Sequence, residues 1–360
     1  MPNRIKIMSW NLRTYGYVAK TAEVVRVIAK TILESRADIV CIQELMCGDQ
    51  NFNVGDPIIG APISAACIQR FNSIIQDLHH LDAPANWDSR ITGRNAGQSL
   101  THSADAYGFL WKRAPVLSQP NFRHGLPATP ATTIGLTAAP PAAPPNNPGI
   151  LNVANFPNRR PGQLRLTIDW VAPGGMGVVL NLSLISFHAT TPTNVYKVFV
   201  RANPPGGRVV FNSQPAAGTA IQWLGRIPEV APVPPALPAV NTIILGDFNY
   251  ELSAARRNPY TSLTDNGYVM GIINPVTKTT YRPNGADPDR FVSSYDNIFH
   301  IGPNLQLVAG SGQNIDFIRD QSLRLINPVT LVASHDRYYG IQYGKGVSDH
   351  LPVVAEYNVM

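Results

Sequence analysis

Cysteine is scarce in this chain of 360 residues, and its few copies follow no metal-binding spacing. The three cysteines, Cys41, Cys47 and Cys67, cannot all pair, and none belongs to a CxxC or Cys/His motif, which argues against a common zinc module. Cys41 falls in an apolar stretch, and this predicts a buried, unreactive thiol in a reducing compartment.

Long hydrophobic runs are also missing. No apolar stretch approaches the roughly 20 residues that span a bilayer, and the N-terminus passes directly into a strand-like alternation. We therefore expect no transmembrane segment and no secretory signal, and both a cytoplasmic enzyme and an exported effector or toxin fit this start. The hydrophobic share of 44% and the mean hydropathy of -0.05 predict a globular protein with a substantial core.

Charged residues make up only 14% of the chain, but the two signs are unequal. The 29 Lys and Arg residues exceed the 23 Asp and Glu residues, which gives a formal net charge of +6 and a pI near 9.3. Such an excess suits an anionic partner without identifying one.

Strand-like and helix-like patterns are mixed along the whole chain. Apolar strands are expected at 5–10, 38–43, 107–111, 163–171, 178–187, 242–245, 295–301 and 351–357. Helical spacing is expected at 21–35, 63–81 and 218–227. Because strands recur from start to finish, we predict one layered domain over residues 1–360, with Pro- and Ala-rich insertions near 126–149 and 228–238.

Polar side chains mark the ends of many of these strands. They are acids, amides and imidazoles, namely Asn11, Glu44, His188, Asp247, Asn249, Asp296, Asp349 and His350. One such residue after a strand is ordinary, because loops begin there. If all these ends meet on one rim, they supply oxygen ligands for a hard divalent cation together with titratable imidazoles.

The short motifs around these residues resemble those of the endonuclease/exonuclease/phosphatase superfamily, the deoxyribonuclease I-like group. In chain order they are SWN (9–11), IQE (42–44), FH (187–188), GDFN (246–249), YDNI (295–298) and SDH (348–350). Each motif alone is weak, whereas the ordered set is specific and spans nearly the whole chain. The region from NRRPGQLRLTI (158–168) to LISFHA (184–189) also resembles the catalytic subunit of cytolethal distending toxins.

This resemblance implies an α/β fold with four layers, in which two packed, mostly antiparallel β-sheets are flanked by helices. It also implies Mg²⁺-dependent hydrolysis of a phosphate ester, with Mn²⁺ or Ca²⁺ as further ions that support activity. Glu44 would be the principal metal carboxylate, Asn11 would hold or support the ion, and Asp349 would help to bind it. Taken alone, Glu44 could equally be an ordinary residue that ends a buried strand.

The resemblance also assigns the catalytic groups. His350 would act at the phosphate, and Asp296 would accept a hydrogen bond from it and fix its tautomer. Asp247 would orient the attacking water, and Asn249 would donate to a phosphate oxygen. A terminal turn without chemistry is the alternative for Asp349 and His350.

A second imidazole would be oriented in a similar way. The segment DAYGFLW (105–111) resembles the deoxyribonuclease segment whose acid pairs with the histidine at the position of His188, so Asp105 is the expected partner of His188. Tyr107 and Arg160 are the expected substrate contacts, and a solvated surface pair is the alternative for Arg160 and its neighbour Arg159. Arg13 stands where several relatives carry an acid, which argues against a second metal site that uses this acid.

Three functions remain open. The first is a DNA endonuclease of low sequence specificity, which fits the basic charge. The second is a phospholipid or phosphoinositide phosphodiesterase or phosphatase of the sphingomyelinase type, although the expected loops carry no aromatic pair for a membrane. The third is a non-catalytic binding module, and the complete set of acids and both histidines argue against it.

Overall fold

A computed structural model describes the elements that build the sheets, the helices that cover them and the loops around the site. The described residues are 3–15, 20–46, 65–82, 87–92, 105–112, 122–124, 134–135, 149–150, 159–171, 177–189, 196–201, 208–214, 217–225, 241–252, 258–272, 278–281, 291–316 and 346–360.

The first sheet is built around the two chain ends. Its order is β17-β19-β1-β2-β4-β3, with β18 also paired to β19. The strands are β1 (Asn3–Tyr15), β2 (Ile39–Met46), β3 (Trp87–Ile91), β4 (Asp105–Lys112), β17 (Leu305–Leu307), β18 (Gln313–Asn314) and β19 (Val353–Val359). The β1–β2 pair is parallel and the other pairs are antiparallel.

The second sheet is built from the middle of the chain. Its order is β13-β16-β12-β9-β8-β5, with β6 and β7 also paired to β8. The strands are β5 (Phe122–His124), β6 (Ile134–Gly135), β7 (Gly149–Ile150), β8 (Gly162–Val171), β9 (Gly177–His188), β12 (Asn241–Asp247), β13 (Val269–Met270) and β16 (Asp296–Ile301). The β9–β12 pair is parallel and the others are antiparallel.

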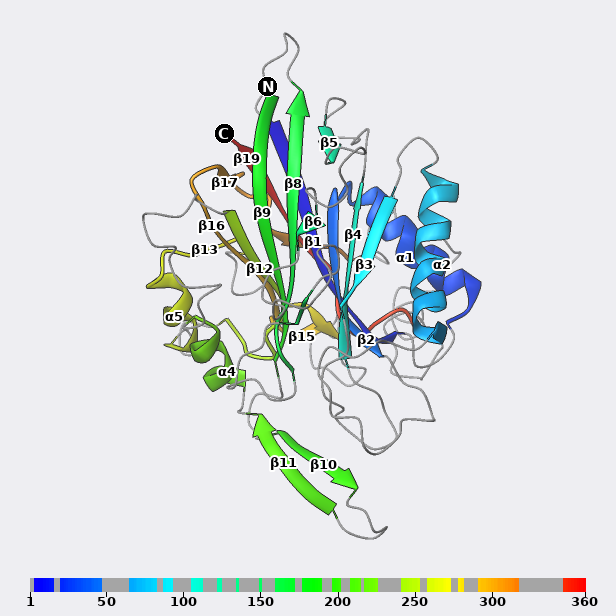
Figure 1. Ribbon diagram of the computed structural model, residues 1–360, viewed down its shortest axis with the longest axis vertical. Helices are drawn as coiled ribbons and strands as arrows, with labels where there is room; N and C mark the ends of the chain where they lie inside the picture. The colour runs from blue at the N-terminus through cyan, green and yellow to red at the C-terminus, as the bar shows by residue number, and fades with distance from the viewer. Residues whose placement is uncertain are drawn as a thin grey trace.

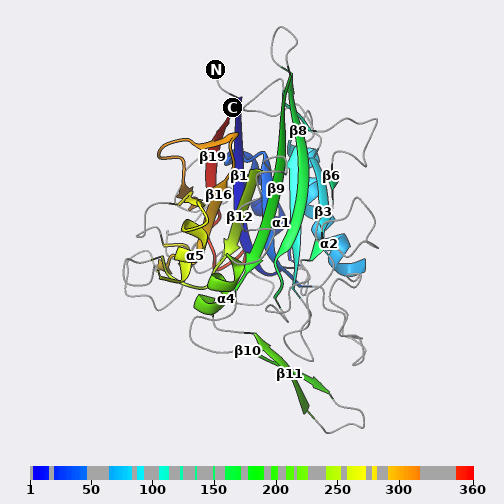
Figure 2. The ribbon, with the colours of Figure 1, turned by 60° about the vertical axis from the view of Figure 1, so that its left-hand side comes forward.

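Helices cover the outer face of each sheet, as Figures 1 and 2 show. The helices α1 (Ala22–Glu34) and α2 (Ala65–Leu81) pack on the first sheet, and α4 (Ala217–Leu224) and α5 (Thr261–Thr264) pack on the second. A third apolar cluster joins the inner faces of the two sheets. The result is a four-layer α/β sandwich, as the sequence predicted.

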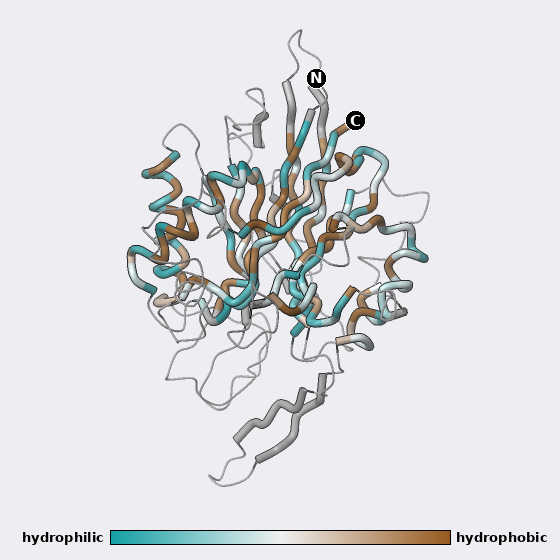
Figure 3. The backbone as a smooth tube through the Cα atoms, turned by 180° about the vertical axis from the view of Figure 1, so that it is seen from behind, coloured by the Kyte–Doolittle hydropathy of each residue, from teal (hydrophilic) through white to brown (hydrophobic). Residues whose placement is uncertain are grey.

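Alternation along the strands produces these layers. On β2, Val40 and Ile42 contact the cluster under α1 and α2, whereas Ile39 and Cys41 contact the cluster between the sheets. The outer helix α1 begins after Thr21, whose side chain accepts a hydrogen bond from the backbone N–H of Val24. Hydrophobic residues accordingly concentrate along the central strands and on the helices in Figure 3.

Two further hairpin-like pairs lie outside the two main sheets. One pairs β10 (Tyr196–Arg201) with β11 (Arg208–Gln214), and it extends from one end of the sandwich in Figure 1. The other pairs β14 (Thr280–Tyr281) with β15 (Phe291–Ser293). Neither pair was predicted from the sequence, and neither was β3.

Most of the predicted strands and helices are present, with shifted ends. The last strand begins at Val353 rather than at residue 351, because Pro352 has no N–H to give to a ladder. The insertion at 228–238 lies outside the described residues, as does most of 126–149. None of the helices in the described ranges is long and apolar enough to cross a bilayer.

Candidate active site

The ends of the two sheets bring polar side chains together. Asn11 Nδ2 donates to Glu44 Oε1 at 3.2 Å within the first sheet and to Asp247 Oδ2 at 3.0 Å on the second. One amide therefore connects the carboxylates of both sheets. On the second sheet, His188 and Asp296 are the ladder partners of Asp247 on either side, so these three residues form a row across β9, β12 and β16.

Glu44 reaches the site because β2 is irregular at this point. Strict alternation would place its side chain on the face of Ile42, toward α1 and α2. Instead, Glu44 has a φ of +57°, and the pairing of β2 with β4 shifts register between Ile42 and Leu45. Such a bulge changes the direction of a side chain, and it turns Glu44 toward Asn11.

Asp247 is held by the residues on both sides of it. The preceding Gly246 has a φ of +144°, and a Cβ there would lie 1.9 Å from the carbonyl oxygen of Phe187. After it, Asn249 has a φ of +47°, and its backbone N–H donates to Asp247 Oδ1 at 2.8 Å. The Asn249 side-chain amide donates to the Ala189 carbonyl at 3.0 Å and to Asp247 Oδ2 at 3.2 Å. Asn249 therefore fixes the orientation of the Asp247 carboxylate.

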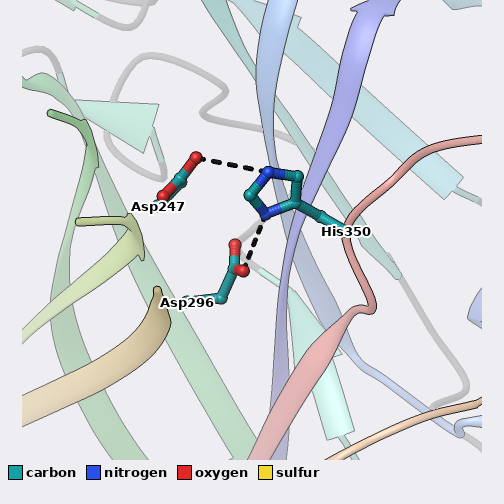
Figure 4. A group of neighbouring side chains, drawn as sticks. All are labelled: Asp247, Asp296 and His350. Atoms are coloured by element: carbon teal, nitrogen blue, oxygen red, sulfur yellow. Dashed lines mark hydrogen bonds and ion pairs between the residues drawn. The ribbon is translucent and has the colours of Figure 1, made fainter. Parts of the chain in front are cut away.

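His350 lies between two carboxylates, as Figure 4 shows. Its Nδ1 is 2.8 Å from Asp296 Oδ2, and its Nε2 is 3.6 Å from Asp247 Oδ2. Burial lowers the pKa of His350, but the charges of Asp296 and Asp247 outweigh this effect and raise the pKa to about 9. His350 is therefore an imidazolium at neutral pH, ready to donate a proton from Nε2.

Thr279 holds the acid of this pair. Its hydroxyl donates to Asp296 Oδ2 at 2.6 Å and accepts from the backbone N–H groups of Tyr295 and Asp296 at 3.2 Å. Burial raises the pKa of Asp296, and the bonds from His350 and Thr279 oppose this effect. No motif pointed to Thr279, which lies 17 residues before Asp296.

The terminal segment that carries His350 is fastened to β1. The Ser348 hydroxyl donates to the Asn11 carbonyl at 2.5 Å and accepts from the His350 N–H at 3.0 Å. The indole N–H of Trp10 donates to the His350 carbonyl at 2.9 Å. Lys20 donates to the Gly346 carbonyl at 2.7 Å. These bonds explain why Ser348 stands beside Asp349 and His350: its side chain anchors the turn.

Asp349 is paired with an arginine. Its Oδ2 accepts a hydrogen bond from Arg13 Nη1, and the Arg13 backbone N–H donates to Asn11 Oδ1 at 2.8 Å. Arg13 has a φ of +36°, an unusual conformation outside glycine. The guanidinium thus lies at the edge of the site, on one of the carboxylates that the sequence assigned to the metal.

His188 contacts a second arginine. Arg159 Nη1 is 2.8 Å from His188 Nε2 and donates to the Ala189 carbonyl at 2.7 Å. His188 Nε2 also lies 3.6 Å from Glu44 Oε1 and from Asp247 Oδ2, contacts that are ionic only when His188 is protonated. Because an arginine can only donate, the shorter contact to Arg159 requires an unprotonated Nε2.

Arg160, Tyr107 and Asp105, the predicted substrate contacts and the predicted partner of His188, are not among the contacts described above. Arg160 is partly buried, which lowers its pKa below the usual arginine value, and its neighbour Arg159 is the arginine that meets His188. Tyr107 is fully buried in the cluster between the sheets, so its position does not offer the phosphate contact that the sequence suggested. Asp105 begins β4 opposite Met46, but its side chain lies outside the described part of the structure, and its pairing with His188 stays a prediction.

The donor chemistry fits a hard divalent cation. Glu44 keeps a side-chain exposure of 15%, and Asp349 Oδ1 is buried without a hydrogen-bond partner among the described residues. Mg²⁺ takes one or two protein carboxylates and keeps several waters, so Glu44 and Asp349 are the residues that would hold it. Asp247, Asp296 and His350 also cluster closely, but the imidazolium between the two acids already supplies their positive charge.

A comparison with known protein families matches most of the chain. The sequence profile of the Endonuclease/Exonuclease/phosphatase family matches residues 8–350. A search of curated protein sequences found no match.

Among the solved structures, one superposes well enough to support the same fold. A family protein from Leptotrichia buccalis superposes with a TM-score of 0.50 at 13% identity, covering 99% of both chains. The human Nocturnin catalytic domain with bound sulfate gives 0.45 at 14% identity, covering 100% of this chain and 94% of that chain. TDP2 of D. rerio with a single-strand DNA product gives 0.44 at 11% identity, covering 99% of each. The profile match extends over nearly the whole length, and the chain belongs to the endonuclease/exonuclease/phosphatase family, whose members hydrolyse phosphoester bonds.

Proposed function

We propose that this protein is a divalent-metal-dependent phosphodiesterase that cleaves DNA internally with low sequence specificity. The observation that carries the proposal is the buried Asp296–His350 pair beside Asp247. A protonated His350, with its Nε2 directed to the site, suits a reaction whose leaving oxygen needs a proton.

Each group has a defined part in this reaction. Asp296 fixes the His350 tautomer through Nδ1 and stabilises the imidazolium, and His350 donates a proton from Nε2 to the leaving oxygen. Asp247, which Asn11 and Asn249 hold in place, accepts a hydrogen bond from the attacking water. A bound divalent ion supplies positive charge for the phosphate oxygens as charge develops on them.

The choice of DNA rests on charge. The chain has a net charge of +6, and phosphate contacts provide most non-specific affinity for DNA. Arg159 lies at the catalytic centre beside His188, and Arg160 follows it in the chain. A guanidinium matches a phosphate with two parallel hydrogen bonds, so we assign these arginines to the phosphates that flank the cleaved bond.

The direct test is a set of parallel assays with the purified protein in Mg²⁺. Supercoiled plasmid should be nicked and then linearised, EDTA should stop the reaction, and the rate should fall steeply as salt rises. Sphingomyelin and phosphoinositide vesicles and soluble inositol polyphosphates should release no product. Release of phosphocholine or inositol-linked phosphate without plasmid nicking would show that the lipid alternative is correct and DNA wrong.

Two variants connect the assay to the site. Glu44→Gln removes the metal carboxylate without a change in volume, so its loss should exceed the about 10- to 100-fold that outer partners of a metal site cost. Arg160→Ala should weaken binding to all duplex sequences equally, because a phosphate contact carries no base information. Wild-type turnover of Glu44→Gln at limiting Mg²⁺ would remove Glu44 from the site.

A further inference from the structure

A layer of buried polar residues lies directly below the catalytic residues. Along β1, β2 and β9, the inner-facing residues Ile7, Cys41 and Leu184 belong to the apolar cluster between the sheets. The next inner-facing positions are Ser9, Gln43 and Ser186, and each is fully buried. Three polar side chains therefore replace the hydrophobic pattern at one level of the sandwich.

Hydrogen bonds join this layer across the two sheets. Gln43 Nε2 donates to Ser186 Oγ on β9 at 2.9 Å and to Ser9 Oγ on β1 at 3.2 Å. The Ser9 hydroxyl also lies 3.4 Å from Gln43 Oε1. The bond between Gln43 and Ser186 crosses from the first sheet to the second, and its direction and length define one distance between them.

Such a layer needs a reason beyond stability. A buried amide loses its water, and one net hydrogen bond returns only about 1 kcal/mol, so well-packed apolar residues would stabilise the interior as well or better. What directional bonds add is a fixed relative position of the two sheets. Gln43 is also the middle residue of the IQE motif, and the chemistry assigned to the site uses only the glutamate.

The layer lies one step from the catalytic groups on each strand. Ser9 precedes Asn11 by two residues, Ser186 precedes His188 by two, and Gln43 precedes Glu44 directly. The site itself is divided between the sheets, and the 3.0 Å bond from Asn11 Nδ2 to Asp247 Oδ2 crosses the same gap. A displacement of about 1 Å between catalytic groups can reduce a rate about 100-fold.

We propose that Gln43 is a positioning residue that, through Ser186 and Ser9, sets the spacing between the Asn11–Glu44 side of the site, on the first sheet, and the Asp247–His188 side, on the second sheet. This inference rests on the phosphodiesterase function proposed above. It assigns a role to the layer as a unit, and it predicts that catalysis depends on the layer more than folding does.

The test variant combines Gln43→Met, Ser9→Ala and Ser186→Ala. It removes every polar atom of the layer at nearly constant volume, so no unpaired hydroxyl remains. The melting temperature should stay the same or rise, while kcat for the simple diester bis(4-nitrophenyl) phosphate should fall about 10- to 100-fold with little change in KM. Mg²⁺ affinity, measured by calorimetry without any substrate, should weaken as well. The milder Ser186→Ala variant should show the same trend if the triple variant folds poorly.

The chain provides a matched control. Gln163 Nε2 donates to Ser183 Oγ at 2.7 Å. This is also a buried bond from a glutamine to a serine, but it lies on the outer face of the second sheet. Gln163→Met with Ser183→Ala should leave kcat and Mg²⁺ affinity unchanged. Unchanged kcat and Mg²⁺ affinity in the folded triple variant, or equal losses in the control, would overturn the proposal. Because neither readout uses DNA, a wrong DNA assignment leaves this test intact.

Discussion

The two ring nitrogens of His350 face different acids, and this decides how the residue titrates. Asp296 is hydrogen-bonded at Nδ1 and Asp247 lies near Nε2, so the pKa rises to about 9 despite burial. A proton donor must be charged to act, so we expect kcat to be constant through neutral pH and to fall as the pH rises through about 9. The pH profile of kcat on bis(4-nitrophenyl) phosphate measures this limb.

Asp296→Asn should move that limb. Without the Asp296 charge the pKa of His350 should drop toward the ordinary histidine value of about 6.5, so activity should decline at a lower pH. Thr279→Val should leave the limb near pH 9, since it removes one bond to Asp296 but keeps the carboxylate charge beside His350. The losses from Asp296→Asn and His350→Ala should be strongly non-additive, and independent losses would mean that the two do not act as a pair.

The same titration affects stability. The pKa of His350 is higher in the folded state than in the unfolded state. Its contribution to the free energy of unfolding is therefore fully present below about pH 6.5 and is lost as the pH rises through about 9. A shift of this size corresponds to about 3 kcal/mol in the metal-free protein. Denaturant midpoints at pH 6, 7.5 and 9.5 should show the decline in the wild type, and His350→Gln should flatten it.

At this scale, sequence motifs identified the acids and imidazoles but not what holds them. The polar residues at strand ends and the ordered family motifs predicted Glu44, Asp247 and His350 as site residues, because the chemistry restricts residue type and spacing. Thr279 carries no such restriction, and the choice of Arg159 over Arg160 at His188 depends on which of two adjacent side chains faces inward. The sequence pattern does not show which of the two arginines faces His188.

At the scale of elements, β12 approaches β9 most tightly, among the glycines of the pair, at Gly246, next to the site. Gly246 combines a φ of +144° with a backbone neighbour 1.9 Å from any Cβ. Gly246→Ala should therefore cost about 3 kcal/mol or more, through strain and overpacking together, and should displace Asp247. Chemical denaturation and kcat should both decline.

Gly310 separates the two causes. It also has a positive φ, +74°, but no atom lies within 4 Å of a Cβ there. Gly310→Ala should cost only the backbone term, about 1 kcal/mol, and leave kcat unchanged. If the two alanine variants were equally stable, the close approach of Phe187 would not be the reason for Gly246.

Element boundaries were predictable where alternation is regular and not where it breaks. The pattern placed Gly177–His188 and Ala22–Glu34 closely, because apolar residues recur at regular spacing along most of each. It ended the second strand at Gln43, whereas β2 continues to Met46 through the bulge at Glu44. A bulge leaves the composition unchanged, so periodicity cannot report it.

At the scale of the whole molecule, the sandwich joins two sheets whose catalytic ends both carry carboxylates. Glu44 lies on the first sheet, and Asp349 lies just before β19 of the same sheet. Asp247 and Asp296 lie on the second sheet. The fold class followed from the sequence because the family motifs occur in order from one end of the chain to the other. The contacts between the two sheets did not follow, since they join residues such as Asn11 and Asp247 that are 236 positions apart.

A cation shared by this rim should stabilise the entire sandwich. A ligand that binds only the folded state adds about 2.7 kcal/mol at 100 times its dissociation constant, so Mg²⁺ should raise the melting temperature by a few degrees and EDTA should reverse the change. Glu44→Gln should reduce this Mg²⁺-dependent increase to near zero, because the principal carboxylate is gone. Glu356→Gln is the matched control: it removes a glutamate whose partner is Arg4, far along β19 from the site, and it should keep the full increase. A full increase in Glu44→Gln, or none in the wild type at millimolar Mg²⁺, would place the ion elsewhere or exclude it, while the Asp296–His350 chemistry could still be tested by its pH profile.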